Sequence, residues 1–291
     1  MWEYLIGLFA LLRALTGIRF FLIKRRVKGS VRIIPEAEPF FNKVSGNKVA
    51  LLIHCFGSSP REFRDLSKYL AKKGISSYAP LLPGHGTSPE RLAVVKYYQW
   101  IESVEEHIDM LSKNYEEIYI VGNSLGGNLA LICSNYSSKI KGIVTLGTPI
   151  VFKNEFFYKR IIFPIFRRIK LFQKKKYSKA ELRYAKKNPT LYMSIPVTSL
   201  IHVSKIIKLS KKELHLINCK VMALYSKPNK YQKKSSSSLF LLDKDSAEYL
   251  AENIKFKKSF AVAIGSKFHN IIYSDNVEDY GLPIYNFINT S

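Results

Sequence analysis

The chain has 291 residues, 47% of them hydrophobic and 23% charged, and its excess of Lys and Arg over Asp and Glu gives a formal net charge of +24. These proportions are those of a globular protein with a full core, and they exclude a disordered, collagenous or polytopic membrane protein. Cys55, Cys133 and Cys219 lie in or beside apolar runs without C-x-x-C spacing, which indicates buried free thiols in a reducing compartment.

The N-terminal segment favours a membrane helix. Residues 1–23 are apolar apart from one glutamate and two arginines, and a basic cluster follows at 24–28. The length is just sufficient for a spanning helix, although each arginine would be costly at the bilayer centre. A cleaved signal peptide fits poorly, because the basic cluster follows the apolar run. We predict that residues 1–28 attach the chain to a membrane, spanning it or lying in its interface, with the rest in the cytoplasm; the alternative is a helix that covers the soluble domain.

The body of the chain alternates strand-like and helical segments. Strands are expected at 31–34, on the edge of the sheet, and at 48–54, 75–80, 118–121, 143–146, 221–225 and 260–264. Helices are expected at 60–73, 97–114 and 128–136. Continuous apolar strands alternating with helices predict an α/β fold, with a mostly parallel sheet flanked by helices. Residues 150–218 separate two strands by far more than one crossover needs, so we expect an insertion with helices of its own.

A candidate nucleophile lies between one of these strands and the helix that follows. Gly122-Asn123-Ser124-Leu125-Gly126 is a weak pattern alone, but a tight strand-to-helix turn would lift the Ser124 hydroxyl clear of the backbone. An incidental serine in a glycine-rich turn is the alternative. Among six histidines, His269 follows the last strand, which gives the chain order of nucleophile, acid and base that this architecture uses. The N–H groups of Leu125 and Phe56 are the expected oxyanion-hole donors.

Four short sequences are typical of one superfamily: Leu-Ile-His-Cys-Phe-Gly-Ser-Ser-Pro at 52–60, Pro-Leu-Leu-Pro-Gly-His-Gly at 80–86, Gly-Asn-Ser-Leu-Gly-Gly at 122–127 and Leu-Gly-Thr-Pro at 146–149. With the insertion and His269, they make the chain resemble an α/β-hydrolase, and within that superfamily the bacterial carboxylesterases and monoacylglycerol lipases. The resemblance implies the α/β-hydrolase fold for residues 29–291, with a helical cap at about 150–218 inserted before the acid-bearing strand. It also implies a serine esterase that cleaves short acyl esters or monoacylglycerol-like lipids through an acyl-serine intermediate. No metal-ligand spacing or phosphate loop is visible, so no cofactor and no metal are expected.

Two positions depart from the family pattern. Cys55 replaces the glycine of the usual His-Gly-Phe, and Asn229 stands where the family has its catalytic aspartate. An amide can accept a hydrogen bond from the imidazole but cannot stabilise the imidazolium by charge. Glu155, Asp243 and Asp245 are possible substitutes, although the last two fall in a helical run expected to face solvent. The alternative function is therefore a catalytically impaired hydrolase that acts as a lipid-binding or scaffolding protein.

The insertion combines basic and apolar side chains. Residues 153–187 hold thirteen Lys and Arg against two Glu, and with residues 1–32 they account for 17 of the 24 net charges. No nucleic-acid-binding module is recognisable, so no nucleic-acid partner is expected, whereas a basic, aromatic-rich face suits an anionic membrane surface. Met193 and Ile195 are predicted to line the acyl pocket; the alternative is that they form the core of the cap.

Overall fold

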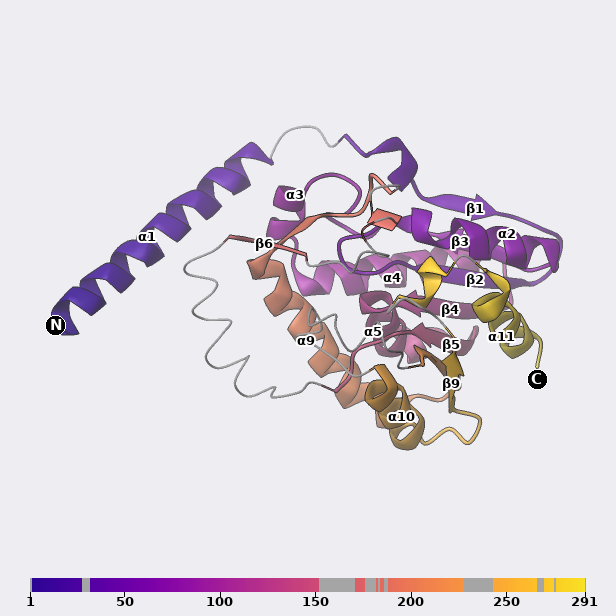
Figure 1. The fold of residues 1–291 in the computed structure, drawn as a ribbon. Coiled ribbons are helices and arrows are strands. Elements are labelled where there is room, and N and C mark those ends of the chain that lie inside the picture. Colours follow the sequence, from indigo (N-terminus) through magenta and orange to yellow (C-terminus); the bar gives the residue numbers. More distant parts are fainter. Residues whose placement is uncertain are drawn as a thin grey trace.

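Six of the seven predicted strands lie in one central sheet, together with one strand that was not predicted. The structure is a computed structural model of the chain that describes residues 2–27, 32–151, 171–175, 182, 184–185, 188–227, 243–265, 270–274 and 276–290. Within these ranges, seven strands lie in the order β1-β3-β2-β4-β5-β8-β9 (Figure 1). Their bounds are β1 (Phe40–Asn42), β2 (Lys48–Ile53), β3 (Ser76–Ala79), β4 (Glu117–Asn123), β5 (Ile140–Leu146), β8 (Lys220–Ser226) and β9 (Phe260–Ile264). The β1–β3 pair is antiparallel and the other pairs are parallel, so the prediction of a mostly parallel sheet in an α/β fold is confirmed.

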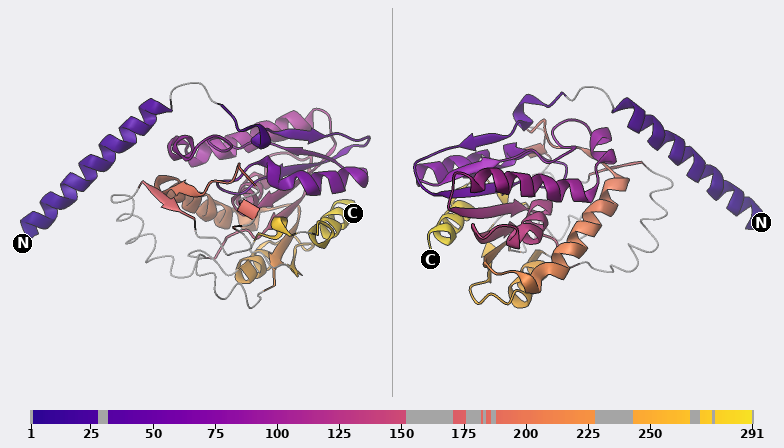
Figure 2. Two further views of the ribbon diagram at one scale, coloured as in Figure 1. Left: turned by 45° about the horizontal axis from the view of Figure 1, so that its top comes forward. Right: turned by 180° about the vertical axis from the view of Figure 1, so that it is seen from behind.

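Helices cover both faces of this sheet (Figure 2). Their bounds are α2 (Arg64–Lys72), α3 (Pro89–Val94), α4 (Tyr97–Ser112), α5 (Leu125–Ile132), α9 (Val197–Glu213), α10 (Asp243–Asn253) and α11 (Glu278–Asn289). Short 3₁₀ turns lie at Pro35–Ala37, Pro60–Phe63, Cys133–Asn135, Leu214–Leu216 and Ile271–Tyr273. Successive residues of β2 point to opposite faces: Leu51 enters the core under α4 and α5, and Leu52 enters the core under α2 and α11. Strands buried on both faces explain the continuous apolar runs in the sequence.

The predicted strand at 31–34 is wrong. Residues 32–34 have no regular structure, and the first described strand is β1. Pro35 begins a 3₁₀ turn directly afterwards, and the Ile34 N–H donates to the Gly86 carbonyl (2.8 Å) instead of joining a ladder. Proline fixes its own φ and lacks an N–H, so it ends the extended run before pairing can continue.

Two predicted helices begin at different residues from those expected. The helix expected at 60–73 opens as the 3₁₀ turn Pro60–Phe63 before α2, and the helix expected at 128 already begins at Leu125. Glycine is unfavourable inside a helix, so the start of the second helix was predicted beyond Gly126 and Gly127.

The three cysteines are free and buried, as predicted.

The described part of the insertion is not purely helical. It contains a two-stranded antiparallel sheet, formed by β6 (Phe172–Lys174) and β7 (Ser194–Pro196), and then α9. Helix α9 packs on the main domain, where the Asn128 side chain donates to Ser210 (2.9 Å) and Ser199 donates to the Leu92 carbonyl (3.0 Å). The aromatic and basic residues at 152–170 lie outside the described residues.

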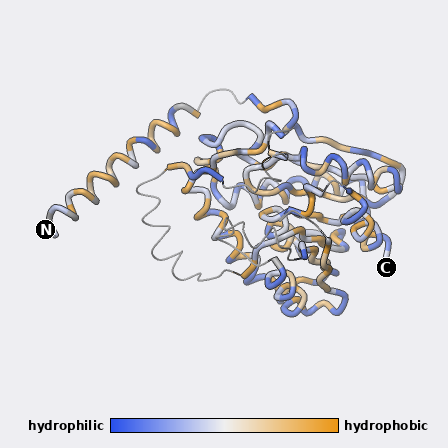
Figure 3. The backbone as a smooth tube through the Cα atoms, viewed as in Figure 1, coloured by the Kyte–Doolittle hydropathy of each residue, from blue (hydrophilic) through white to orange (hydrophobic). Residues whose placement is uncertain are grey.

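Helix α1 (Trp2–Arg26) stands apart from the sheet and its covering helices (Figures 1 and 3). Its segment Ile6–Arg25 has a mean hydropathy of 1.9, and none of that window is buried inside the structure. By length and composition this helix could cross a membrane, although a signal sequence has the same features. Because the window is unburied, the alternative of a helix that covers the soluble domain is not what the structure shows.

Candidate active site

Ser124 occupies a strained turn at the carboxyl end of β4. Its φ of 51° and ψ of −110° are unusual for a residue with a side chain, and it is the one non-glycine residue with positive φ among those described. The Ser124 N–H donates to the Leu146 carbonyl of the neighbouring strand (2.8 Å), which fixes the turn on the sheet. Such strain costs of order 1–3 kcal/mol and persists only where the surroundings enforce it. Its side chain is half-buried, at the edge where parallel strands β2, β4, β5 and β8 end.

The glycines around Ser124 are required by close backbone packing. A Cβ atom on Gly126 would lie 2.0 Å from the Ile53 carbonyl oxygen, and one on Gly122 would lie 2.3 Å from the Gly126 carbonyl carbon. A Cβ on Gly127 would lie 1.9 Å from Thr148 Oγ1. Helix α5 can therefore start directly behind the serine only because these positions lack side chains.

The loop after β2 runs beside this turn and is fixed by hydrogen bonds. The Cys55 carbonyl accepts from the Ser58 N–H (3.2 Å) and from His54 Nδ1 (3.0 Å), and the Leu82 N–H donates to His54 Nε2 (3.0 Å). Both nitrogens of His54 are thus engaged, and burial lowers the pKa of this imidazole to about 4. His54 is therefore a neutral structural residue.

Two backbone N–H groups remain available near Ser124. Neither the Phe56 N–H nor the Leu125 N–H donates a hydrogen bond to the part of the chain that the structure describes. Two carbonyls of the same loop are engaged by the insertion: the Phe56 carbonyl accepts from Lys175 Nζ (3.0 Å), and the Gly57 carbonyl accepts from the Tyr192 N–H (2.8 Å). Backbone N–H groups without an acceptor among the described residues, in a loop whose carbonyls are held in place, are the feature that an oxyanion hole requires.

Tyr192 ties the insertion to this loop and to the loop at 80–89. Its hydroxyl accepts from the Thr87 N–H (2.9 Å) and donates to the Gly84 carbonyl (3.1 Å), and its ring stacks on His85 with centroids 6.4 Å apart. His85 is buried, and burial lowers its pKa well below the ordinary value. Neither Tyr192 nor Lys175 was predicted from the sequence as a residue of the site. Lys175 lies in a run of lysines that is typical of a surface facing solvent or lipid.

Of the two predicted acyl-pocket residues, the structure brings one to this loop. Ile195 is buried, and its Cγ2 would be 3.4 Å from a Cβ on Gly57. The Met193 side chain is 47% exposed, while its carbonyl accepts from the Lys175 N–H (2.9 Å).

The predicted base His269 and the acid-position residue Asn229 lie outside the described residues, as does Glu155. The last residues described before them follow neighbouring strands: the Lys227 N–H, just after β8, donates to the Ile264 carbonyl at the end of β9 (2.8 Å). Strands β8 and β9 therefore end at the same edge of the sheet as Ser124. Asp245 is exposed on α10, as predicted for a solvent-facing helix.

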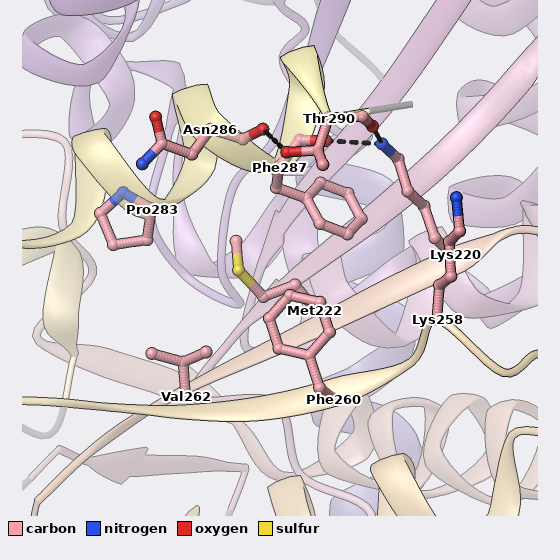
Figure 4. Close-up of a pocket in the computed structure, with 9 residues that line it drawn as sticks. All are labelled: Lys220, Met222, Lys258, Phe260, Val262, Pro283, Asn286, Phe287 and Thr290. Carbon is pink, nitrogen blue, oxygen red and sulfur yellow. Dashed lines mark hydrogen bonds between the residues drawn. The ribbon is translucent and has the colours of Figure 1, made fainter.

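A cavity of about 590 Å³ lies elsewhere in the molecule (Figure 4). Its walls are Lys220, Met222, Lys258, Phe260, Val262, Pro283, Asn286, Phe287 and Thr290. Lys220 and Phe260 are the first residues of β8 and β9, so the cavity is at the amino edge of the sheet, opposite Ser124. Lys220 Nζ donates to the carbonyls of Phe287 (2.7 Å) and Thr290 at the end of α11, which is a structural role. Within the described ranges, no group of three or more His, Cys, Asp or Glu side chains could hold a metal ion.

The chain is similar in sequence to known hydrolases. A family model described as serine aminopeptidase, S33 matches residues 45–241, about two thirds of the chain. A thermostable monoacylglycerol lipase of Bacillus sp. (strain H-257) is 33% identical over 118 residues, 40% of this chain and 47% of that protein. A carboxylesterase of Bacillus subtilis is 37% identical over 119 residues, 40% of this chain and 48% of that protein, so the chain spans about half the length of these curated relatives. The crystal structure of a Paleococcus ferrophilus monoacylglycerol lipase superposes with a TM-score of 0.69 at 17% identity, covering 86% of this chain and 97% of that one.

Proposed function

The chain belongs to the serine aminopeptidase S33 family of α/β hydrolases, and from this we propose that it is a serine hydrolase cleaving carboxylic esters, either short acyl esters or monoacylglycerol-like lipids. The observation that carries the proposal is the strained φ of Ser124 at the turn between β4 and α5. A turn that costs free energy and leaves a hydroxyl accessible is expected where the hydroxyl reacts. The names of the curated relatives, a monoacylglycerol lipase and a carboxylesterase, support this choice of substrate.

In the proposed reaction, Ser124 Oγ attacks the ester carbonyl while His269 accepts the hydroxyl proton. The negative oxygen of the tetrahedral intermediate would be bound by the N–H groups of Phe56 and Leu125, where each such donor contributes roughly 2.7–4 kcal/mol. His269 then protonates the departing alcohol, which leaves an acyl group on Ser124. A water molecule activated by His269 attacks this acyl-serine, and release of the acid restores the free hydroxyl. Ile195 would line the acyl side of the pocket.

The purified protein tests the proposal directly. We expect it to hydrolyse p-nitrophenyl esters and monoacylglycerols and to be covalently labelled by a fluorophosphonate probe, because such probes react with activated serines. Absence of both hydrolysis and labelling between pH 6 and 9 would contradict the proposal. It would favour the second candidate, a catalytically impaired hydrolase that binds lipid, for which the specific observation is an amide at position 229.

Replacing Asn229 by aspartate is expected to increase kcat. If Asn229 orients His269, a carboxylate at the same place would add charge stabilisation of the imidazolium that an amide cannot supply. In serine proteases the reverse change costs about 10⁴ in kcat, so a gain of at least about tenfold is expected here. Esterase kinetics of Asn229→Asp and of the control Asn276→Asp measure it. Unchanged or lower activity at position 229 would mean that another group orients the histidine.

We also propose that α1 attaches the protein to an anionic membrane surface, with the catalytic domain in the cytoplasm and no nucleic-acid partner. Deleting residues 1–28 is expected to move the protein from the membrane pellet to the soluble fraction, because the deletion removes the exposed apolar segment Ile6–Arg25. Fractionation with immunoblotting measures this, and esterase activity of the truncated protein is the control for folding. Retention of the truncated protein in the pellet would indicate that the basic insertion, rather than α1, binds the membrane.

A further inference from the structure

A buried carboxyl group lies between the two segments that carry the proposed site. Glu62 follows the loop after β2, in the 3₁₀ turn Pro60–Phe63, and is 4% exposed. Its Oε1 accepts two hydrogen bonds, from the Cys55 N–H (2.9 Å) and from Asn123 Nδ2 (2.9 Å). Its Oε2 lies 3.4 Å from Cys55 Sγ, which is positioned to donate to it.

The partners of this one oxygen are the residues that directly precede the proposed catalytic groups. Cys55 precedes Phe56, whose N–H is a proposed oxyanion donor, and Asn123 precedes the nucleophile Ser124. Cys55 belongs to the loop after β2, and Asn123 is the last residue of β4. Glu62 therefore links the oxyanion loop to the nucleophile turn through a single atom.

Such a carboxyl group is costly to bury. Burial raises the pKa of Glu62, and the hydrogen bonds that its carboxyl group accepts oppose that rise only in part. A polar group that loses water is tolerated when its hydrogen bonds replace the lost solvation. Asn123 and Cys55 are themselves buried, so removing Glu62 would leave the Cys55 N–H and the Asn123 amide without their acceptor.

We propose that Glu62 is a positioning residue that fixes the Phe56 N–H relative to Ser124 by holding the preceding residue of each with one carboxyl oxygen. The proposal rests on the proposed hydrolase function. It assigns to Glu62 no contact with the substrate. Because displacement of a reacting group by about 1 Å can reduce a rate by about 10², loss of this link should act on catalysis more than on binding.

Three variants separate positioning from general stability. Glu62→Leu removes the acceptor, and we expect kcat to fall about 10- to 100-fold with KM little changed. Glu62→Gln keeps an oxygen for both donors, so kcat is expected to stay close to the wild-type value. Glu117→Leu is the matched control, since Glu117 also accepts a side-chain hydrogen bond, from Tyr119 (2.9 Å), but at the opposite end of β4. It should leave kcat unchanged.

Amide hydrogen exchange of the segment 48–63 reports on the same link without requiring turnover. The Cys55 amide should exchange faster in Glu62→Leu and at the wild-type rate in Glu62→Gln. Unchanged kcat and exchange in a folded Glu62→Leu variant would overturn the inference, as would a Glu62→Gln variant as impaired as Glu62→Leu. If Glu62→Leu does not fold, Glu62→Asp replaces it, because its shorter side chain cannot reach both donors. If the wild type hydrolyses no ester, the proposed function fails, and the exchange rates alone decide whether Glu62 holds the loop.

Discussion

Replacement of Ser124 by alanine is expected to abolish ester hydrolysis and fluorophosphonate labelling while the protein remains folded. Without the hydroxyl no acyl-serine can form, and loss of the nucleophile in another serine hydrolase lowers kcat by about 10⁶. A small residual rate over water is expected, because the Phe56 and Leu125 N–H groups would still stabilise a tetrahedral intermediate. Steady-state kinetics and labelling of the purified variant measure the effect. Labelling of Ser124→Ala at the wild-type rate would place the nucleophile elsewhere in the chain.

Glycine at the same position is expected to separate catalysis from strain. Ser124→Gly loses the hydroxyl as alanine does, but a φ of 51° is freely available to glycine. Relief of about 1–3 kcal/mol of backbone strain exceeds the roughly 0.5–1 kcal/mol that glycine's extra freedom in the unfolded chain costs. The glycine variant should therefore unfold at a higher temperature than the alanine variant, by calorimetry. Equal stabilities of the two variants would mean that the turn is not strained.

The parts of the site that could be predicted are those that depend on residues close together in the sequence. The Gly122–Gly126 sequence allowed the nucleophile turn to be predicted, because the turn imposes its own requirement for small residues. The long spacing between the strands at 143–146 and 221–225 likewise predicted the insertion. Both features are visible from the order and spacing of residues along the chain, so a single sequence was sufficient to predict them.

Features that depend on contacts between distant segments could not be predicted in this way. Lys175 reaches the Phe56 carbonyl across 119 positions of the chain, and nothing in a run of lysines distinguishes the one that does so. Glu62 lies in a sequence that is typical of the first turn of a helix, where a glutamate is usually exposed. Its burial follows from the approach of β4 to the loop after β2. The strands of the two-stranded sheet formed by β6 and β7 are three residues long, too short to produce a periodic pattern.

Substitution of Gly126 by alanine is expected to destabilise the native state strongly. The added Cβ would lie 2.0 Å from the carbonyl oxygen and 2.7 Å from the carbonyl carbon of Ile53, and both are backbone atoms of a central strand. They cannot move alone, because β2 and β4 are paired from Lys48 and Glu117 to Ile53 and Gly122. Overpacking of this kind costs about 1–3 kcal/mol or more even where side chains can adjust, and here none of the contacting atoms belongs to a side chain.

The sign of this effect is informative, because Gly126 lies inside α5. In an unobstructed helix, alanine is favoured over glycine by about 1 kcal/mol, so any destabilisation must come from the contact with β2. The matched control is Gly265→Ala, since a Cβ at that exposed position meets no atom within 4 Å. We expect the control to retain the wild-type melting temperature and soluble yield, and Gly126→Ala to be insoluble or to melt at least several degrees lower. A stable Gly126→Ala protein would show that α5 and the nucleophile turn can retreat from β2, and Ser124 would then lose the close approach to the Phe56 loop on which the proposed oxyanion hole depends.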